Sequence, residues 1–79
     1  MKSNIEKYNS TFTETFGIEQ EILPDLKYQD IQEWDSVGHM NLVGELEEVF
    51  QIELEIDDIT DLSSYGQGKT ILKKYNVEF

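Results

Sequence analysis

Residues 34–50 of the 79-residue chain read WDSVGHMNLVGELEEVF and give its clearest structural signal. Five apolar side chains in this stretch recur at steps of three or four, the spacing of one helix face: Val37, Met40, Val43, Leu46 and Phe50. Asp35 and Ser36 directly precede this face. Both residue types favour a helix start, because their side-chain oxygens accept hydrogen bonds from free backbone N–H groups. The stretch therefore predicts a helix that begins at Asp35-Ser36 and ends near Phe50.

The preceding segment predicts another helix and then a long connection. Over residues 4–16, apolar side chains again recur at helical spacing, and Gly17 ends the pattern. Pro24 opens a turn, from which an extended connection leads to Trp34. We expect the large indole of Trp34 to pack this connection against the helices.

The segments after residue 50 predict a short helix and a final helix. Residues 52–56 alternate apolar and acidic side chains, which on local pattern favours a strand, but a single strand has no partner in this chain. We expect instead a short helical turn capped by Asp57 or Asp58. A last helical segment begins after Ser63-Ser64, and its apolar positions lie in residues 70–75. The prediction is an all-α fold: a small bundle of three main helices plus one short helix, with a long loop between the first and second helices.

Length and composition restrict the class of protein. The length suits one domain, residues 1–79, and makes an enclosed enzyme cleft improbable. The chain has no cysteine and one histidine, which excludes disulfides, thiolate zinc sites and multi-histidine metal sites. Neither an apolar run of membrane-spanning length nor a signal peptide is visible. We therefore expect a cytoplasmic protein. We also expect it to act as a monomer.

The formal net charge of −11 is concentrated in the middle of the sequence. Residues 28–68 contain no Lys or Arg, whereas the flanking segments carry lysines as well as acidic residues. A surface of this sign repels phosphate backbones, which excludes nucleic acid as a partner and favours basic protein surfaces. The acidic residues expected to meet such partners are Glu45, Glu47, Glu48, Glu53, Asp57 and Asp58.

One local feature could support covalent chemistry, the serine at the start of the second predicted helix. Ser36 can be only a helix cap. It can also be a nucleophile, but Trp34 stands where a G-x-S-x-G elbow has its first glycine, and the chain is too short for the sheet that such an elbow needs. Finally, it can accept a prosthetic group, because a phosphodiester there would face free backbone N–H groups and the positive end of the helix dipole.

Three motifs follow one another in this part of the chain: Asp35-Ser36-Val37, then Glu47-Glu48-x-Phe50, then Ile52-Glu53-Leu54. Their order and spacing resemble the acyl carrier proteins. In that family an Asp-Ser-Leu motif opens the second helix, an acidic segment ending in Glu-Glu-x-Phe closes it, and an Ile-x-Ile/Leu segment leads to a short third helix. The resemblance extends over most of the chain, although the first third matches only in pattern.

The resemblance implies that Ser36 carries 4′-phosphopantetheine, transferred from coenzyme A by a separate, magnesium-dependent phosphopantetheinyl transferase. The thiol of this arm would hold an acyl or aminoacyl group as a thioester. The family resemblance thus implies a carrier and not an enzyme. A loading enzyme would supply the cargo, and downstream synthases or transferases with basic patches would use it, in fatty acid, polyketide or specialised, polysaccharide-linked biosynthesis. The residues expected to line the core and to accept an aliphatic cargo are Met40, Val43, Leu46, Ile59, Leu62 and Ile71.

Some residues depart from the family pattern or lie outside it. Val37 replaces the usual leucine, and Gly38 places a weak helix former in the first turn, which predicts a mobile helix start or an altered contact surface. We interpret His39 as a surface residue, and Gly66 and Gly68 as turn residues. A competing class stays open: a non-covalent acidic protein-interaction module in which the serine is only a helix cap.

Overall fold

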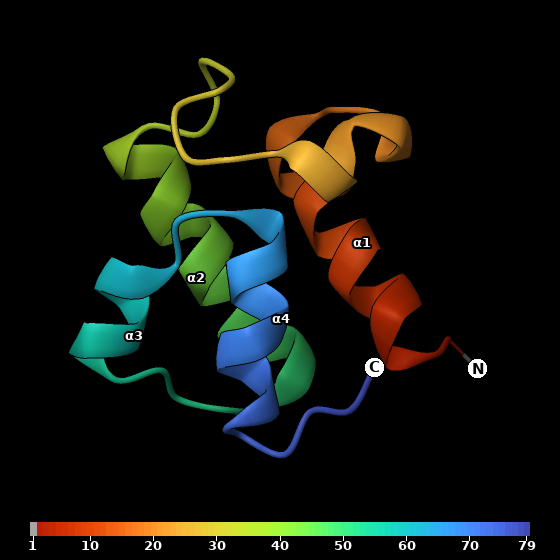
Figure 1. The fold of residues 1–79 in the computed structure, drawn as a ribbon, viewed down its shortest axis with the longest axis vertical. Coiled ribbons are helices and arrows are strands. Elements are labelled where there is room, and N and C mark those ends of the chain that lie inside the picture. Colours follow the sequence, from red (N-terminus) through yellow and green to blue (C-terminus); the bar gives the residue numbers. More distant parts are fainter. Residues whose placement is uncertain (1) are drawn as a thin grey trace.

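Five helical segments make up the fold of residues 2–79 in the computed structural model (Figure 1). Their bounds are α1 (Asn4–Phe16), the 3-10 helix η1 (Gln20–Asp25), α2 (Ser36–Phe50), α3 (Ile56–Asp61) and α4 (Tyr65–Lys73). These residues form no strand, and one isolated antiparallel bridge joins Lys27 to Ser64. The predicted all-α bundle is confirmed.

The bounds of α1 and α2 agree with the sequence-based expectation because each helix carries its own end signals. Ser3 and Glu6 form a reciprocal capping box at the start of α1, and Gly17 ends the helix in the left-handed conformation at φ 66°. At the start of α2 the Asp35 side chain accepts a hydrogen bond from the Gly38 N–H at 2.8 Å. Gln51 ends α2 in the left-handed region at φ 56°.

The connection between α1 and α2 contains more structure than the sequence analysis predicted. Residues 20–25 form a 3-10 helix that contains Pro24, where the sequence predicted a simple turn. The loop that follows is fastened to the beginning of α4: the Tyr28 N–H donates to the Ser63 carbonyl, and the Tyr65 N–H donates to the Leu26 carbonyl. These backbone bonds hold the loop that leads to α2.

The second half of the chain needs two corrections. α3 begins at Ile56 after Glu55, so Asp57 and Asp58 lie in its first turn and do not cap it. Their charges still suit that end, because the helix dipole is positive there. α4 begins directly after Ser64, whose hydroxyl caps it by accepting from the Gln67 N–H at 3.0 Å, and it ends at Lys73, before the expected Tyr75. Gly66 and Gly68, which we had interpreted as turn residues, are therefore helical.

Aromatic side chains of α1 and of the loop form much of the core, and α1 and α2 are the helices with the largest mutual contact. Tyr8 and Phe12 are fully buried in α1, and Phe16 lies one turn further on, stacked on Trp34 with ring centroids 5.4 Å apart. The predicted packing role of Trp34 is thus confirmed. The buried side of α2 is formed by Gly38, Leu42, Val43 and Leu46.

Met40 contradicts the predicted core, because 55% of its surface is exposed. Successive helical residues are rotated by about 100°. Met40 therefore lies nearly opposite Gly38 and Leu42, which are both buried. The apolar spacing through Val37 and Met40 was correct as a helix signal, but it gave the wrong rotation of the first two turns.

Candidate functional site

Ser36 is the first residue of α2 and is exposed. The capping function at this helix start belongs to Asp35, whose carboxylate accepts from the Gly38 N–H. Within residues 2–79 the Ser36 hydroxyl itself has no hydrogen-bond partner. The sequence analysis left open whether Ser36 is only a cap, and in this structure it is not the cap. Its hydroxyl is free for chemistry at the positive end of a 15-residue helix.

The loop in front of Ser36 is held by Trp34. This side chain has no solvent exposure, and it packs on Phe16 and against the edge of Phe12 at a centroid distance of 5.6 Å. Its indole N–H donates to Nδ1 of His39 at 3.0 Å. A fully buried anchor two residues before Ser36 fixes where the chain enters α2.

His39 is a half-buried bridging residue, so its interpretation as a simple surface residue was wrong. One ring nitrogen accepts from Trp34, and the other lies 2.8 Å from the Ile59 carbonyl oxygen of α3. A partner 20 residues along the chain gives no signal in the local sequence.

Gly38 has a packing reason that helix propensity did not reveal. It is buried, and a Cβ built on it would overlap the Glu33 carbonyl oxygen and lie 3.3 Å from the Phe16 ring. The loop backbone therefore crosses the first turn of α2 at a distance that only glycine allows. This close approach sets the position of the Asp35-Ser36 segment.

The predicted acidic surface is smaller than expected. Glu45, Glu48, Glu53 and Asp57 are exposed. Glu47 is half-buried and accepts from the Leu54 N–H at 2.9 Å, which ties the end of α2 to the segment before α3. Asp58 is only 7% exposed. Of the six predicted acidic residues, partners can therefore reach Glu45, Glu48, Glu53 and Asp57, which we call the acidic face.

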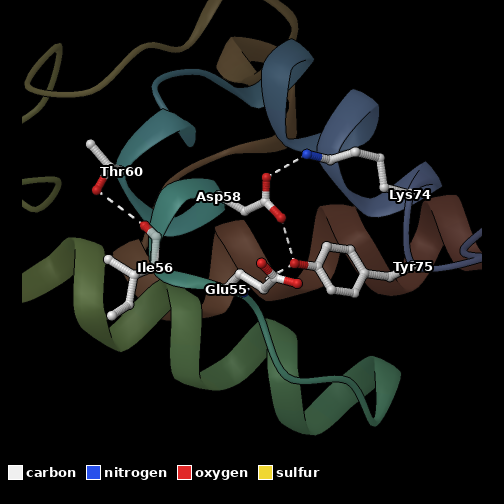
Figure 2. Close-up of polar contacts among 6 residues, drawn as sticks. All are labelled: Glu55, Ile56, Asp58, Thr60, Lys74 and Tyr75. Carbon is white, nitrogen blue, oxygen red and sulfur yellow. Dashed lines mark hydrogen bonds and ion pairs between the residues drawn. The ribbon is translucent and has the colours of Figure 1, made fainter.

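Asp58 is the centre of a polar cluster between α3 and the end of α4 (Figure 2). One carboxylate oxygen pairs with the Lys74 ammonium, and the other accepts from the Tyr75 hydroxyl. That hydroxyl in turn accepts from the Glu55 N–H at 3.0 Å. The hydrogen bonds from Lys74 and Tyr75 hold the pKa of Asp58 below its ordinary value, although burial of the carboxyl opposes this shift. The cluster therefore holds α3 against the residues at the end of α4.

Asp58→Asn is expected to lower the melting temperature at neutral pH, because it removes the charge that Lys74 and Tyr75 bind. A lowered pKa means that the stabilisation is present above the unfolded-state value and disappears as the pH falls through the lower folded-state value. The difference between wild type and Asp58→Asn should therefore close below about pH 4. Thermal melts of both proteins from pH 7 to 2 measure this difference in melting temperature, and Asp57→Asn serves as the exposed control. A gap that persists at pH 2 would contradict this account.

Raising the salt concentration should raise the melting temperature, because the acidic residues repel one another across the surface of α2 and α3. Going from about 10 mM to about 150 mM salt shortens the screening length from roughly 30 Å to 8 Å. Thermal melts of the wild type and of a Glu45→Gln, Glu48→Gln double variant measure the effect. We expect a smaller rise in the double variant, and a salt-independent wild type would disprove the repulsion.

Three exposed apolar side chains accompany this surface. Val37 and Met40, 70% and 55% exposed, are three residues apart on α2 and so share a side of the helix. Ile56, at the start of α3, is 80% exposed. The exposure of Val37 and Met40 was not predicted, because the first two turns of α2 had been assigned to the core.

A pocket of about 260 Å³ opens between the loop, α2 and α3. Of the six residues predicted to line a cargo site, Ile59 and Leu62 line this pocket. Val43, Leu46 and Ile71 are buried in the core, and Met40 is exposed. The other pocket walls come from Tyr28, His39, Thr60 and Ser63.

None of the helices formed by residues 2–79 combines the length and apolar character needed to cross a membrane. Comparison of the chain with protein-family models, with curated proteins and with solved structures found no match.

Proposed function

We propose that the protein is an acyl carrier, which holds an acyl or aminoacyl group as a thioester on a 4′-phosphopantetheine arm attached to Ser36. The observation that carries this proposal is the exposed Ser36 hydroxyl at the start of α2, with Asp35 supplying the helix cap. A serine needed only as a cap would occupy the position that Asp35 holds. The motif resemblance described above supports the same residue.

The helix start suits the phosphodiester that such an arm requires. Backbone N–H groups of the first turn and the positive dipole end favour an anion there. Ser36 would supply the oxygen of the ester bond, Asp35 would keep the first turn closed, and Trp34 would hold the entering chain. When bound, the arm supplies a thiol that forms the thioester. The chain itself positions the arm and provides the surface that partner enzymes recognise.

The exposed residues of α2 and of the start of α3 support recognition by basic enzymes. The acidic face lies on α2 and near the start of α3, and Val37, Met40 and Ile56 provide apolar contact area. Charge steering combined with small apolar contacts favours fast association and fast release, which suits a carrier that visits several enzymes. We propose as partners a phosphopantetheinyl transferase, a loading enzyme and downstream synthases or transferases, all in the cytoplasm.

The experiment that tests this proposal is intact-mass spectrometry of the folded protein. The protein is incubated with coenzyme A, magnesium and a broad-specificity phosphopantetheinyl transferase, and an established carrier protein serves as the positive control. A mass gain of one phosphopantetheine group is the expected result. If the control is modified and this protein is not, the carrier assignment fails and the non-covalent acidic interaction module becomes the better account.

A further inference from the structure

We propose that His39 is a proton-sensitive latch, which holds α3 against α2 while its ring is neutral and releases α3 when the ring takes up a proton. The latch consists of Trp34, His39 and the Ile59 carbonyl, and it spans the loop, α2 and α3. The proposal rests on the contacts of the imidazole and does not depend on what Ser36 carries.

The buried indole fixes the tautomer of the ring. An indole N–H can only donate, so Nδ1 of His39 must be an acceptor and carries no proton. In a neutral ring the proton then lies on Nε2, which donates to the Ile59 oxygen. Both bonds therefore use one defined neutral form of His39.

The Ile59 carbonyl is one of the last acceptors of α3. A helix leaves its final carbonyls without partners inside the helix, and α3 has only six residues. The imidazole satisfies this carbonyl from α2, so it acts as a side-chain cap contributed by a different helix. The Asp58 cluster joins α3 to the residues at the end of α4, and His39 joins α3 to α2. Both polar contacts hold this short helix in place.

A proton on Nδ1 breaks this arrangement. The ring would then point an N–H at the Trp34 N–H, and a fully buried indole would lose its acceptor. Trp34 is held by the aromatic core, whereas His39 is half-exposed, so the histidine ring is the part that moves. As the ring leaves, the Ile59 carbonyl loses its donor and α3 is freed on that side.

Groups from three elements surround the ring, and they differ in the charge that they favour. On its own helix, the backbone carbonyl of Asp35 accepts from the backbone N–H of His39, and the positive dipole end of α2 disfavours a cation in the first turns. From the loop, the ring faces the edge of Tyr28 at 5.4 Å. α3 carries three aspartates: Asp58, which Lys74 and Tyr75 bind, and the exposed Asp57 and Asp61.

The latch also forms part of the pocket wall. His39 and Tyr28 line one side of the 260 Å³ pocket, and Ile59 and Thr60 line the α3 side. The bond between His39 and Ile59 joins these two sides. Releasing it changes the width of the pocket, so acidification would open the space between α2 and α3.

Nuclear magnetic resonance from pH 8 to 5, the range in which imidazole side chains change charge, tests the latch on the full chain. Ring signals of His39 report its protonation, and the single indole N–H reports Trp34. Exchange of the Ile59 and Leu62 amides, which are bonded to the Glu55 and Asp58 carbonyls, reports α3. We expect all three to change together, with protection of the α3 amides falling about tenfold after correction for intrinsic exchange. The Gly17 amide of α1 should stay unchanged.

The variant His39→Gln distinguishes a proton-sensitive latch from a merely structural residue. Its amide can accept from Trp34 and donate to Ile59, but it does not titrate in this range. We expect a closed α3 at every pH in this variant. Three results would overturn the proposal: a His39 ring that stays neutral down to pH 5, α3 amides that ignore its protonation, or an unchanged pH response in His39→Gln.

Discussion

Ser36→Ala should lose all phosphopantetheine loading while keeping its fold and its melting temperature. The exposed hydroxyl of Ser36 makes no hydrogen bond within residues 2–79, and Asp35 caps α2, so its removal should change the free energy of unfolding by less than about 0.5 kcal/mol. Loading, in contrast, requires the hydroxyl oxygen of Ser36 for the ester bond to the arm, and alanine supplies no such oxygen. Intact mass after incubation with the transferase measures loading, and circular dichroism measures the fold.

Ser64→Ala is the matched control, because Ser64 stands at the start of α4 and its hydroxyl does cap that helix. Losing this cap should cost about 1 kcal/mol and lower the melting temperature by roughly 4–8 °C. Loading should remain complete. The pair thus separates capping from attachment, and a Ser36→Ala protein that still gains the arm would refute attachment at Ser36.

Gly38→Ala should destabilise the protein strongly. Alanine normally stabilises a helix relative to glycine by about 1 kcal/mol, but here its Cβ would overlap the Glu33 carbonyl oxygen. Because the obstacle is backbone and not a flexible side chain, the loop must move, and we expect a net loss of about 2 kcal/mol, or roughly 10 °C in melting temperature. The displaced loop leads directly into Asp35 and Ser36, so loading should also slow.

Gly44→Ala tests the same substitution in the same helix without an obstacle. A Cβ at Gly44 meets nothing within 4 Å, and the residue is exposed. We expect a gain in stability of about 1 kcal/mol from helix propensity alone. Thermal melts of both variants measure the contrast. If both glycines respond alike, the close approach of the loop to α2 is not as described.

Features set by neighbouring residues could be predicted from the sequence. The bounds of α1 followed from its apolar spacing and from Gly17, and those of α2 from the Asp35-Ser36 start. Ser36 was singled out for the same reason, because its candidate role depends on its place at a helix start. Trp34 was assigned to packing on its size alone, and the structure confirms this.

Features set by distant residues could not be predicted. Asp58 looked like any other surface acid, because its partners Lys74 and Tyr75 lie 16 and 17 residues further along the chain. His39 looked exposed because the Ile59 carbonyl belongs to a different helix. Gly68 looked like a turn residue, but a Cβ there would overlap the Tyr8 hydroxyl, so glycine lets α4 pack against α1. These three errors have one cause: local patterns do not show which elements come into contact.

The proposed carrier function combines the local and the distant features. Local sequence supplies the serine at the helix start, and long-range packing through Trp34 and Gly38 sets its position. α2 and the segment around the start of α3 also carry the acidic face and exposed apolar residues, a surface suited to basic enzymes. The arm at Ser36 is the claim on which this account depends.

Mapping the arm to one residue is the decisive test of attachment at Ser36. Cleavage after lysine leaves Ser36, Ser63 and Ser64 on one peptide, because residues 28–68 lack lysine and arginine. Cleavage after glutamate releases residues 34–45, in which Ser36 is the only hydroxyl side chain. If the arm is attached at Ser36, fragmentation of this peptide after treatment with the transferase will locate the phosphopantetheine on Ser36. An arm found on another peptide, or a folded protein left unmodified beside a modified control carrier, would contradict it.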